Sequence, residues 1–194
     1  MWYARWGMAV VDGTILLMLG ALLAMERPKL YSLFDRPLGT LSSPRIVVVK
    51  SRNLLTVYDG RRVAKRYHVI SGRNPGDKVK EGDARTPAGE FYVCYKNPQS
   101  KYTLSLGLSY PRKSDADRGL RDGLITQADY DQVLAAIAAN DIEKWWKTPL
   151  GGEIMIHGAK NDRTGTAGCV AMSDDDVREL YPQIPEGTMV EIQE

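Results

Sequence analysis

The segment from Arg45 to Gly72 constrains the fold more than any other part of the chain. It contains the runs RIVVVK and LLTVYDG, both rich in the β-branched residues that favour strands. The dipeptide Asp59-Gly60 ends the second run and is a strong signal for a tight hairpin turn, and RRVAKRYHVISG follows as the return strand. The sequence therefore predicts that the folded part opens with strands joined by an antiparallel hairpin.

The rest of the chain continues this β pattern, interrupted by few helices. Strands are expected in EFYVCYK, YTLSLGLSY, GEIMIHG, Cys169–Met172 and GTMVEIQ. A helix is expected in ITQADYDQVLAAIAAN, where Thr126 serves as N-cap and Asp129 follows three residues later. Its apolar face comprises Tyr130, Val133, Leu134, Ile137 and Ala138. A second, short helix follows Ser173, because the aspartates at 174–176 suit the positive end of a helix dipole. The predicted fold is mainly β with one or two short helices.

The N-terminal segment differs in composition from everything that follows it. Between Trp6 and Met25 the only charged residue is Asp12, and a helix of about 20 residues just spans the hydrocarbon core of a bilayer. No A-x-A-like cleavage site follows the apolar run, which favours an uncleaved signal anchor over a cleaved signal peptide or a buried core helix. The expected organisation is an apolar helix acting as signal anchor or signal peptide at residues 1–27, a linker at 28–44 and the folded domain at 45–193.

Charge and cysteine content exclude several classes of function. The formal net charge is +2 and no basic patch is interleaved with aromatic residues, so nothing indicates a nucleic-acid partner. Two cysteines are too few for a disulfide framework, although one bridge between Cys94 and Cys169 remains possible. Cys94 alternates with aromatic residues and is expected to be a buried strand residue. His68 is expected to be a strand residue without a chemical role.

The segment IMIHGAKNDRTGTAGCVAMSDDD places His157 and Cys169 within one strand-loop-strand unit. A thiol with a free pKa of about 8.5 is mostly unreactive at neutral pH, and a neighbouring imidazole lowers that pKa and accepts the proton. Gly168 permits a tight turn, so the amides of Gly168 and Cys169 can converge as an oxyanion hole for acyl transfer. The alternative is a small core cysteine near a structural histidine. A metal site is not expected, because no further Cys or His lies at ligand spacing.

Together with its upstream motifs, this unit resembles the L,D-transpeptidase catalytic domain, also called the YkuD domain. The family signature has a His-Gly pair, a variable loop, and a small hydroxyl residue followed by x-Gly-Cys and an apolar residue, here His157-Gly158 and Thr166–Val170. A Thr-Pro-x-Gly-x-aromatic turn precedes it at Thr86–Phe91, and LSLGLSYPRKSDADRGL is similar to a subgroup of murein transpeptidases and related amidases. Two positions depart from the family pattern, since Ala167 replaces a frequent histidine and Ala171 a frequent arginine.

The resemblance covers roughly residues 45–192 and implies a β-sandwich-like fold, no metal and no organic cofactor. It implies that Cys169 attacks the carbonyl after the third residue, diaminopimelate or lysine, of a peptidoglycan stem tetrapeptide and expels D-alanine. His157 would act as general base and then acid, and an amine would resolve the thioester into a 3→3 cross-link. Further roles implied by the resemblance are oxyanion and loop support from Gly168, Thr166 and Gly158, and substrate contacts from Thr86, Pro87, Gly89, Tyr110 and Arg118.

Other functions stay open at this point. Water in place of the amine makes the same site a hydrolase on murein, and a non-catalytic wall-binding module would use the same groove. A cytosolic thiol enzyme of the papain type fits poorly with the apolar N-terminus and the Thr-Pro-x-Gly turn. A peptidoglycan substrate places the domain outside the cytoplasmic membrane, anchored by the N-terminal segment. A nucleophilic Cys169 also argues against a bridge to Cys94.

Overall fold

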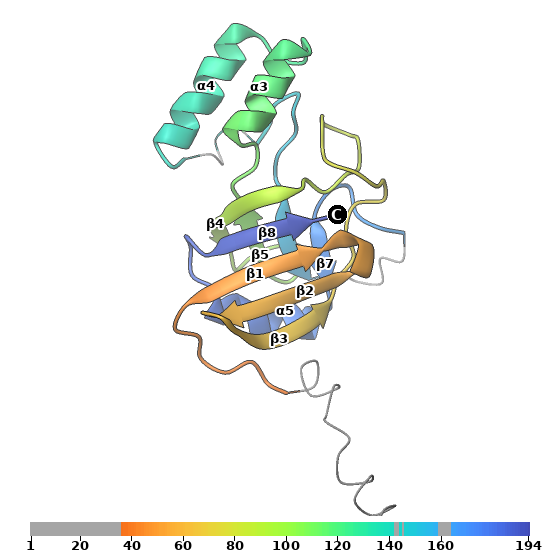
Figure 1. The fold of residues 1–194 in the computed structure, drawn as a ribbon, viewed down its shortest axis with the longest axis vertical. Helices are drawn as coiled ribbons and strands as arrows, with labels where there is room; N and C mark the ends of the chain where they lie inside the picture. The colour runs from red at the N-terminus through yellow and green to blue at the C-terminus, as the bar shows by residue number, and fades with distance from the viewer. Residues whose placement is uncertain (1–35, 142–143, 145, 159–163) are drawn as a thin grey trace, which may run out of the picture. The chain divides into compact units, whose positions relative to one another are not determined.

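The computed structural model describes residues 36–194, apart from residues 142–143, 145 and 159–163. The helix expected at residues 1–27 therefore lies outside the described residues. In the described part, eight strands form one sheet in the order β3-β2-β1-β8-β4-β5-β6-β7 (Figure 1). Their bounds are β1 Pro44–Val49, β2 Leu54–Asp59, β3 Arg62–His68, β4 Gly89–Asn97, β5 Ser105–Leu108, β6 Met155–Gly158, β7 Val170–Met172 and β8 Met189–Gln193.

All eight strands lie in segments that the sequence predicts to be extended. The hairpin between β2 and β3 turns at Gly60 and Arg61, one residue later than the predicted Asp59-Gly60, because Asp59 still pairs with Arg62. Gly60 has a φ of +59° that other residues seldom adopt. The strand expected from Cys169 begins at Val170, so Cys169 itself lies in the preceding loop. β1 and β8 pair in parallel near the centre of the sheet, which brings the two ends of the folded part together.

The sheet curls until its two edges meet. Beyond β3, Ile70 forms an antiparallel bridge with Ala171 of β7, with N–O distances of 2.7 and 2.8 Å in the two directions. Gly72 forms a second bridge with Thr166. The predicted sandwich-like fold is therefore one nearly closed sheet whose halves enclose a common core. The core includes Ile46, Val48, Leu55, Val57, Phe91, Val93, Leu106, Leu108, Ile156, Val170, Val190 and Ile192, each at most 2% exposed.

The described residues contain three α-helices rather than the predicted one or two. They are α3 (Lys113–Arg121), α4 (Gln127–Ala138) and α5 (Asp174–Leu180), with short 3-10 turns at η1 (Lys50–Arg52) and η3 (Tyr181–Gln183). In the sequence, α3 and α4 come between β5 and β6. In space the two helices lie side by side (Figure 1), and they share a small apolar cluster with Leu150. No helix in the part of the chain that the structure describes is long and apolar enough to cross a membrane.

The predicted helix starts are confirmed. Thr126 Oγ1 accepts from the Asp129 N–H, and the Asp129 carboxylate accepts from the Thr126 N–H, so the two residues form a capping box. At the start of α5, Ser173 Oγ accepts from the Asp176 N–H at 3.1 Å. The predicted apolar face of α4 is partly wrong, because Ala138 is exposed and does not contribute to it.

Helix α3 is not predicted from the sequence, because KSDADRGLR is almost entirely polar. In place of large apolar side chains it buries Asp115, which is 0% exposed and accepts from the guanidinium groups of Arg112 and Arg118. It also presents Gly119 to the small cluster, where a Cβ atom would lie only 2.4 Å from Leu150 Cδ2. An aspartate and a glycine thus occupy positions where a periodicity search expects leucine or valine.

Part of the expected linker packs on the fold. Arg36 donates from Nε and Nη2 to the Ala64 carbonyl at 3.1 and 2.6 Å, along the edge strand β3. Leu38 is 8% exposed and belongs to the core, and its N–H donates to Glu179 Oε1 of α5 at 2.7 Å. Residues 36–41 thus cover part of a sheet edge that would otherwise expose its unpaired backbone groups.

Glu179 is expected to make the fold sensitive to acid. Burial alone would raise the pKa of its carboxyl, but Lys65 Nζ at 2.6 Å, the Leu38 N–H and the Tyr67 hydroxyl at 2.9 Å outweigh burial and hold the pKa below its ordinary 4.5. A carboxyl with a lowered pKa stabilises the fold above pH 4.5, and this contribution is lost as the pH falls through the folded-state value. Glu179→Gln should lower stability at neutral pH and flatten its decline in acid, as measured by denaturant unfolding at several pH values. Glu186→Gln, on an exposed carboxyl, is the control, and an unchanged decline in Glu179→Gln would contradict the assignment.

Candidate active site

β6 and β7 bring the predicted His–Cys pair to one place. The two strands pair in parallel, with Ile156 opposite Val170 and His157 opposite Ala171, and Cys169 directly precedes Val170. The side chains of His157 and Cys169 both line a cleft of about 850 Å³. Two residues that are separated by a loop in the sequence therefore share one cavity in the fold.

The environment of His157 determines which ring nitrogen is basic. The side chain is 6% exposed, and Nδ1 lies 2.5 Å from the carbonyl oxygen of Gly158. A carbonyl oxygen only accepts hydrogen bonds, so the neutral imidazole carries its proton on Nδ1. The lone pair is then on Nε2, which is the nitrogen able to accept a proton from another group.

The Cys169 thiol is protonated at rest. It is only partly exposed, and Sγ donates to the Glu153 carbonyl at 3.4 Å. Burial raises the pKa of the thiol, and the opposing contributions of the Met155 N–H and the Lys78 ammonium do not compensate. The expectation that the neighbouring imidazole lowers the thiol pKa stays a prediction, because His157 is not among the causes of this shift. A reactive thiolate at this position requires a base at the moment of reaction.

Thr166 organises the loop that carries the thiol. Gly168 has a φ of +146°, and its N–H donates to Thr166 Oγ1 at 3.0 Å. The same hydroxyl donates to the Cys169 carbonyl at 2.6 Å. The Gly168 amide, which the sequence analysis pairs with the Cys169 amide as an oxyanion hole, is thus bonded to Thr166 in this structure. Its place in such a hole would require that bond to open.

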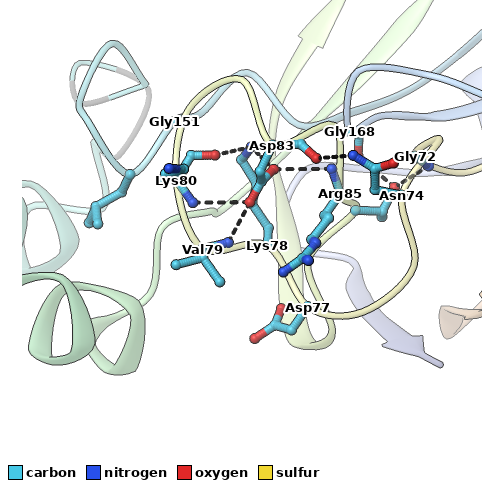
Figure 2. A network of polar contacts seen from close by, with 12 residues as sticks. Gly72, Asn74, Asp77, Lys78, Val79, Lys80, Asp83, Arg85, Gly151 and Gly168 are labelled. Atoms are coloured by element: carbon cyan, nitrogen blue, oxygen red, sulfur yellow. Dashed lines mark hydrogen bonds and ion pairs between the residues drawn. The ribbon is translucent and has the colours of Figure 1, made fainter. Parts of the chain in front are cut away.

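A polar loop from Gly72 to Arg85 lies beside Gly168, the residue that precedes Cys169, as Figure 2 shows. Asp83 accepts from the N–H groups of Val79, Lys80 and Arg85 and forms an ion pair with Lys78 Nζ at 3.0 Å. Burial raises the pKa of Asp83, but these four donors outweigh it and hold the pKa below its ordinary value. The carboxylate therefore fixes the shape of the loop.

Thr86 connects this support loop to the nucleophile. Its side chain is 0% exposed, and Oγ1 accepts from the Gly72 N–H at 2.8 Å and donates to the Gly168 carbonyl at 2.7 Å. A Cβ atom at position 168 would lie 3.0 Å from the Arg85 carbonyl oxygen, so the loop lies directly against Gly168. The Thr-Pro-x-Gly turn thus acts on the site through the backbone of its neighbour.

The five residues expected to contact substrate are not among the described residues that line the cleft. Thr86 and Pro87 are buried, and the buried Tyr110 donates from its hydroxyl to the Leu150 carbonyl at 3.0 Å. Gly89 lies against the Arg112 guanidinium, and Arg118 donates to Asp77, Asp115 and the Lys78 carbonyl. Their hydrogen bonds and burial give them structural contacts in the fold, and their contact with substrate stays a prediction.

The cleft contains other residues that the sequence analysis does not single out. Aromatic rings and charges of both signs complete it, from Tyr95, Tyr102, Trp146, Lys78, Lys101, Lys144, Glu81 and Glu153. The ring of Tyr102 stacks on the imidazole of His157, with 4.4 Å between ring centroids. No motif connects these residues to His157 and Cys169, because most of them are distant in the chain and only the fold brings them together.

Comparisons with known proteins agree with this geometry. The family model of the L,D-transpeptidase catalytic domain, YkuD, matches residues 43–192. No curated protein matches the chain. Among solved structures, the helical cell shape determining protein Pgp2 from Campylobacter jejuni is similar in two forms. A point mutant of Pgp2 has a TM-score of 0.55 and 24% sequence identity, and the match covers 84% of this chain and 51% of that one. The unmutated Pgp2 has a TM-score of 0.53 and 23% identity, with coverages of 84% and 53%.

An L,D-transpeptidase from Xylanimonas cellulosilytica DSM 15894 is more distant, with a TM-score of 0.48 at 17% identity over 91% of this chain and 69% of that one. The chain spans about half the length of the Pgp2 structures it matches. At these identities the structural likeness establishes the fold alone. The family match extends over most of the chain and includes both His157 and Cys169. The chain therefore belongs to the L,D-transpeptidase catalytic domain family.

Proposed function

We propose that this chain is a cysteine-dependent acyltransferase that acts on peptidoglycan stem peptides. The observation that carries the proposal is the cleft shared by His157 and Cys169, in which the imidazole has Nδ1 engaged and Nε2 basic. Membership of the L,D-transpeptidase family supports the substrate class.

In the first half-reaction, His157 Nε2 accepts the thiol proton while Cys169 Sγ attacks the carbonyl carbon after the third stem residue. The carbonyl electrons move to the oxygen, and the Cys169 N–H is the candidate donor to this oxyanion. The tetrahedral intermediate then collapses and breaks the amide bond. The imidazolium returns its proton to the leaving nitrogen, and D-alanine departs, which leaves a thioester on Cys169.

In the second half-reaction, an amine attacks the thioester carbonyl, and His157 Nε2 accepts a proton from the attacking nitrogen. Collapse of the intermediate expels the thiolate, which regains that proton from the imidazolium. The product is a new amide between two stem peptides. Water in place of the amine gives the free tripeptide instead, so the same residues would support hydrolysis.

The raised pKa of Cys169 fits this sequence of proton transfers. The thiol stays protonated until a carbonyl is available, and the proton leaves as the new bond forms. A protonated thiol is also less readily oxidised than a thiolate, which suits an oxidising compartment. We propose that the domain works in the cell envelope, outside the cytoplasmic membrane, anchored by residues 1–27. Its proposed role there is in cell wall biogenesis and cell shape, and the Pgp2 neighbour is described as a helical cell shape determining protein.

The test uses the purified full chain and a disaccharide-tetrapeptide, with intact mass followed with and without an amine acceptor. We expect release of D-alanine and a tripeptide adduct on Cys169. A dimeric product in the presence of the acceptor identifies a transpeptidase, and tripeptide alone identifies a hydrolase. Binding of murein without an adduct or D-alanine release would contradict the proposal and favour a wall-binding module.

A further inference from the structure

One side chain of the cleft contacts the imidazole of His157 directly. The Tyr102 ring stacks on it, with 4.4 Å between centroids and 24° between the ring planes. Tyr102 is 46% exposed, which is unusual for a large aromatic residue in this fold, and it lines the cleft. An exposed ring kept parallel to an imidazole needs a backbone that holds it there.

The residue after Tyr102 provides that backbone constraint. Thr103 has a φ of +74°, a conformation that is costly for a β-branched residue and persists only where surrounding structure enforces it. Its Oγ1 donates to Asp174 Oδ1 at 2.8 Å, and Asp174 is the first residue of α5. The strained turn that presents Tyr102 is therefore bonded to α5.

Gly158 of β6 leaves the space in which Asp174 and the Tyr102 backbone approach each other. A Cβ atom at position 158 would lie 2.5 Å from Asp174 Oδ1 and 2.7 Å from the Tyr102 carbonyl oxygen. Any larger residue would thus displace Asp174 Oδ1, which accepts from Thr103, or the backbone of Tyr102. The glycine that follows His157 has two functions in this geometry, since its carbonyl also accepts from Nδ1.

We propose that Tyr102 is a positioning residue for His157, held in place by the Thr103–Asp174 bond across Gly158. The proposal rests on the role of His157 as the base in the proposed function. Stacking limits rotation of the imidazole and covers one of its faces, so the ring keeps the orientation in which Nδ1 contacts the Gly158 carbonyl. An aromatic face also favours a cation over a neutral ring, so Tyr102 stabilises the imidazolium that forms when the thiol loses its proton.

The chain has two histidines, which makes a direct test possible. Imidazole signals of the full chain are followed by NMR as a function of pH, with His68 at the end of β3 as internal control. Tyr102→Leu should lower the His157 pKa by roughly half a pH unit and leave the His68 titration unchanged. Tyr102→Phe keeps the ring, so His157 should titrate in it as in the wild type.

A second measurement reports the thiol without any murein substrate. The rate of Cys169 alkylation by iodoacetamide at neutral pH should fall about tenfold in Tyr102→Leu, because a misplaced base accepts the proton poorly. Thr103→Val, which keeps the branched shape and lacks the hydroxyl, should show a fall in the same direction, and Thr103→Ser should restore the wild-type rate.

Outcomes that overturn the proposal are distinct from those that overturn the proposed function. If Tyr102→Leu leaves the His157 titration and the alkylation rate unchanged and only raises KM for the tetrapeptide, Tyr102 is a substrate platform and the proposal is wrong. If both readouts shift as expected in a chain that never releases D-alanine, the positioning role stands and the murein substrate is wrong.

Discussion

Replacing Cys169 by alanine should abolish D-alanine release and formation of the mass adduct, while the chain stays folded. The thiol is the only group in the proposed mechanism that forms a covalent bond to the substrate, so its loss leaves no route to the thioester. Cys169 is only partly buried, and its thiol interacts with backbone groups alone, the Glu153 carbonyl and the Met155 N–H. We therefore expect a change in unfolding free energy of no more than about 1 kcal/mol, measured by denaturant titration.

Two further variants test the base and provide a control for the loss of a thiol. His157→Ala should retain the thiol and lose about 10²–10⁴-fold in rate, because base catalysis is removed. Cys94→Ser is the matched control, since this second thiol lies on β4 with its Sγ 3.5 Å from the Gly107 carbonyl and is not among the described residues that line the cleft. Full turnover by Cys169→Ala would contradict the nucleophile assignment, and an inactive Cys94→Ser would point to a second essential thiol.

Replacing Thr86 by valine should destabilise the domain by roughly 2–4 kcal/mol and should also lower activity. Valine has nearly the shape of threonine but cannot bond, so the Gly72 N–H and the Gly168 carbonyl both lose a partner where the side chain is 0% exposed. Leaving a buried polar group unsatisfied costs about 1–3 kcal/mol. Because Gly168 directly precedes Cys169, the same loss also loosens the loop that carries the thiol.

Thr86→Ser provides the comparison, because it restores the hydroxyl and removes only a methyl group. Denaturant unfolding and D-alanine release should both return most of the way to wild type in this variant. Equal stabilities for the valine and serine variants would show that the hydroxyl bonds contribute nothing. Normal activity in a destabilised Thr86→Val would separate the stability of the domain from the geometry of the site.

Strands were predicted well from the sequence because their signals are local. β-branched runs bounded by turn residues, and the Asp59-Gly60 pair, mark each strand without reference to the rest of the fold. Helix α3 was missed because its buried positions are filled by Asp115, satisfied by two arginines, and by Gly119, against which Leu150 packs. Both compensations come from tertiary structure, and no window of the sequence reveals them.

In the candidate site, too, some features follow from local sequence and others depend on tertiary structure. His157, Gly168 and Cys169 lie in one short segment whose residue types already suggest acyl transfer. The Thr-Pro-x-Gly segment leads directly into β4, and its expected substrate contact stays a prediction, because the Thr86 hydroxyl donates to the Gly168 carbonyl and Thr86 is not among the described residues that line the cleft. Tyr102 went unnoticed, since its relation to His157 depends on a turn strained at Thr103. Sequence identifies residue types, and only the fold gives their orientation.

The candidate site forms only after the two edges of the sheet have paired, at Ile70 with Ala171 and at Gly72 with Thr166. His157 and Cys169 belong to the last part of the chain, but the backbone that supports them, from Ile70 to Thr86, belongs to the first half. Contacts between segments so distant in sequence form slowly, because the intervening chain must first be ordered. The thiol therefore gains its full environment only when the sheet closes, and a partly folded chain has the signature residues without a working cleft.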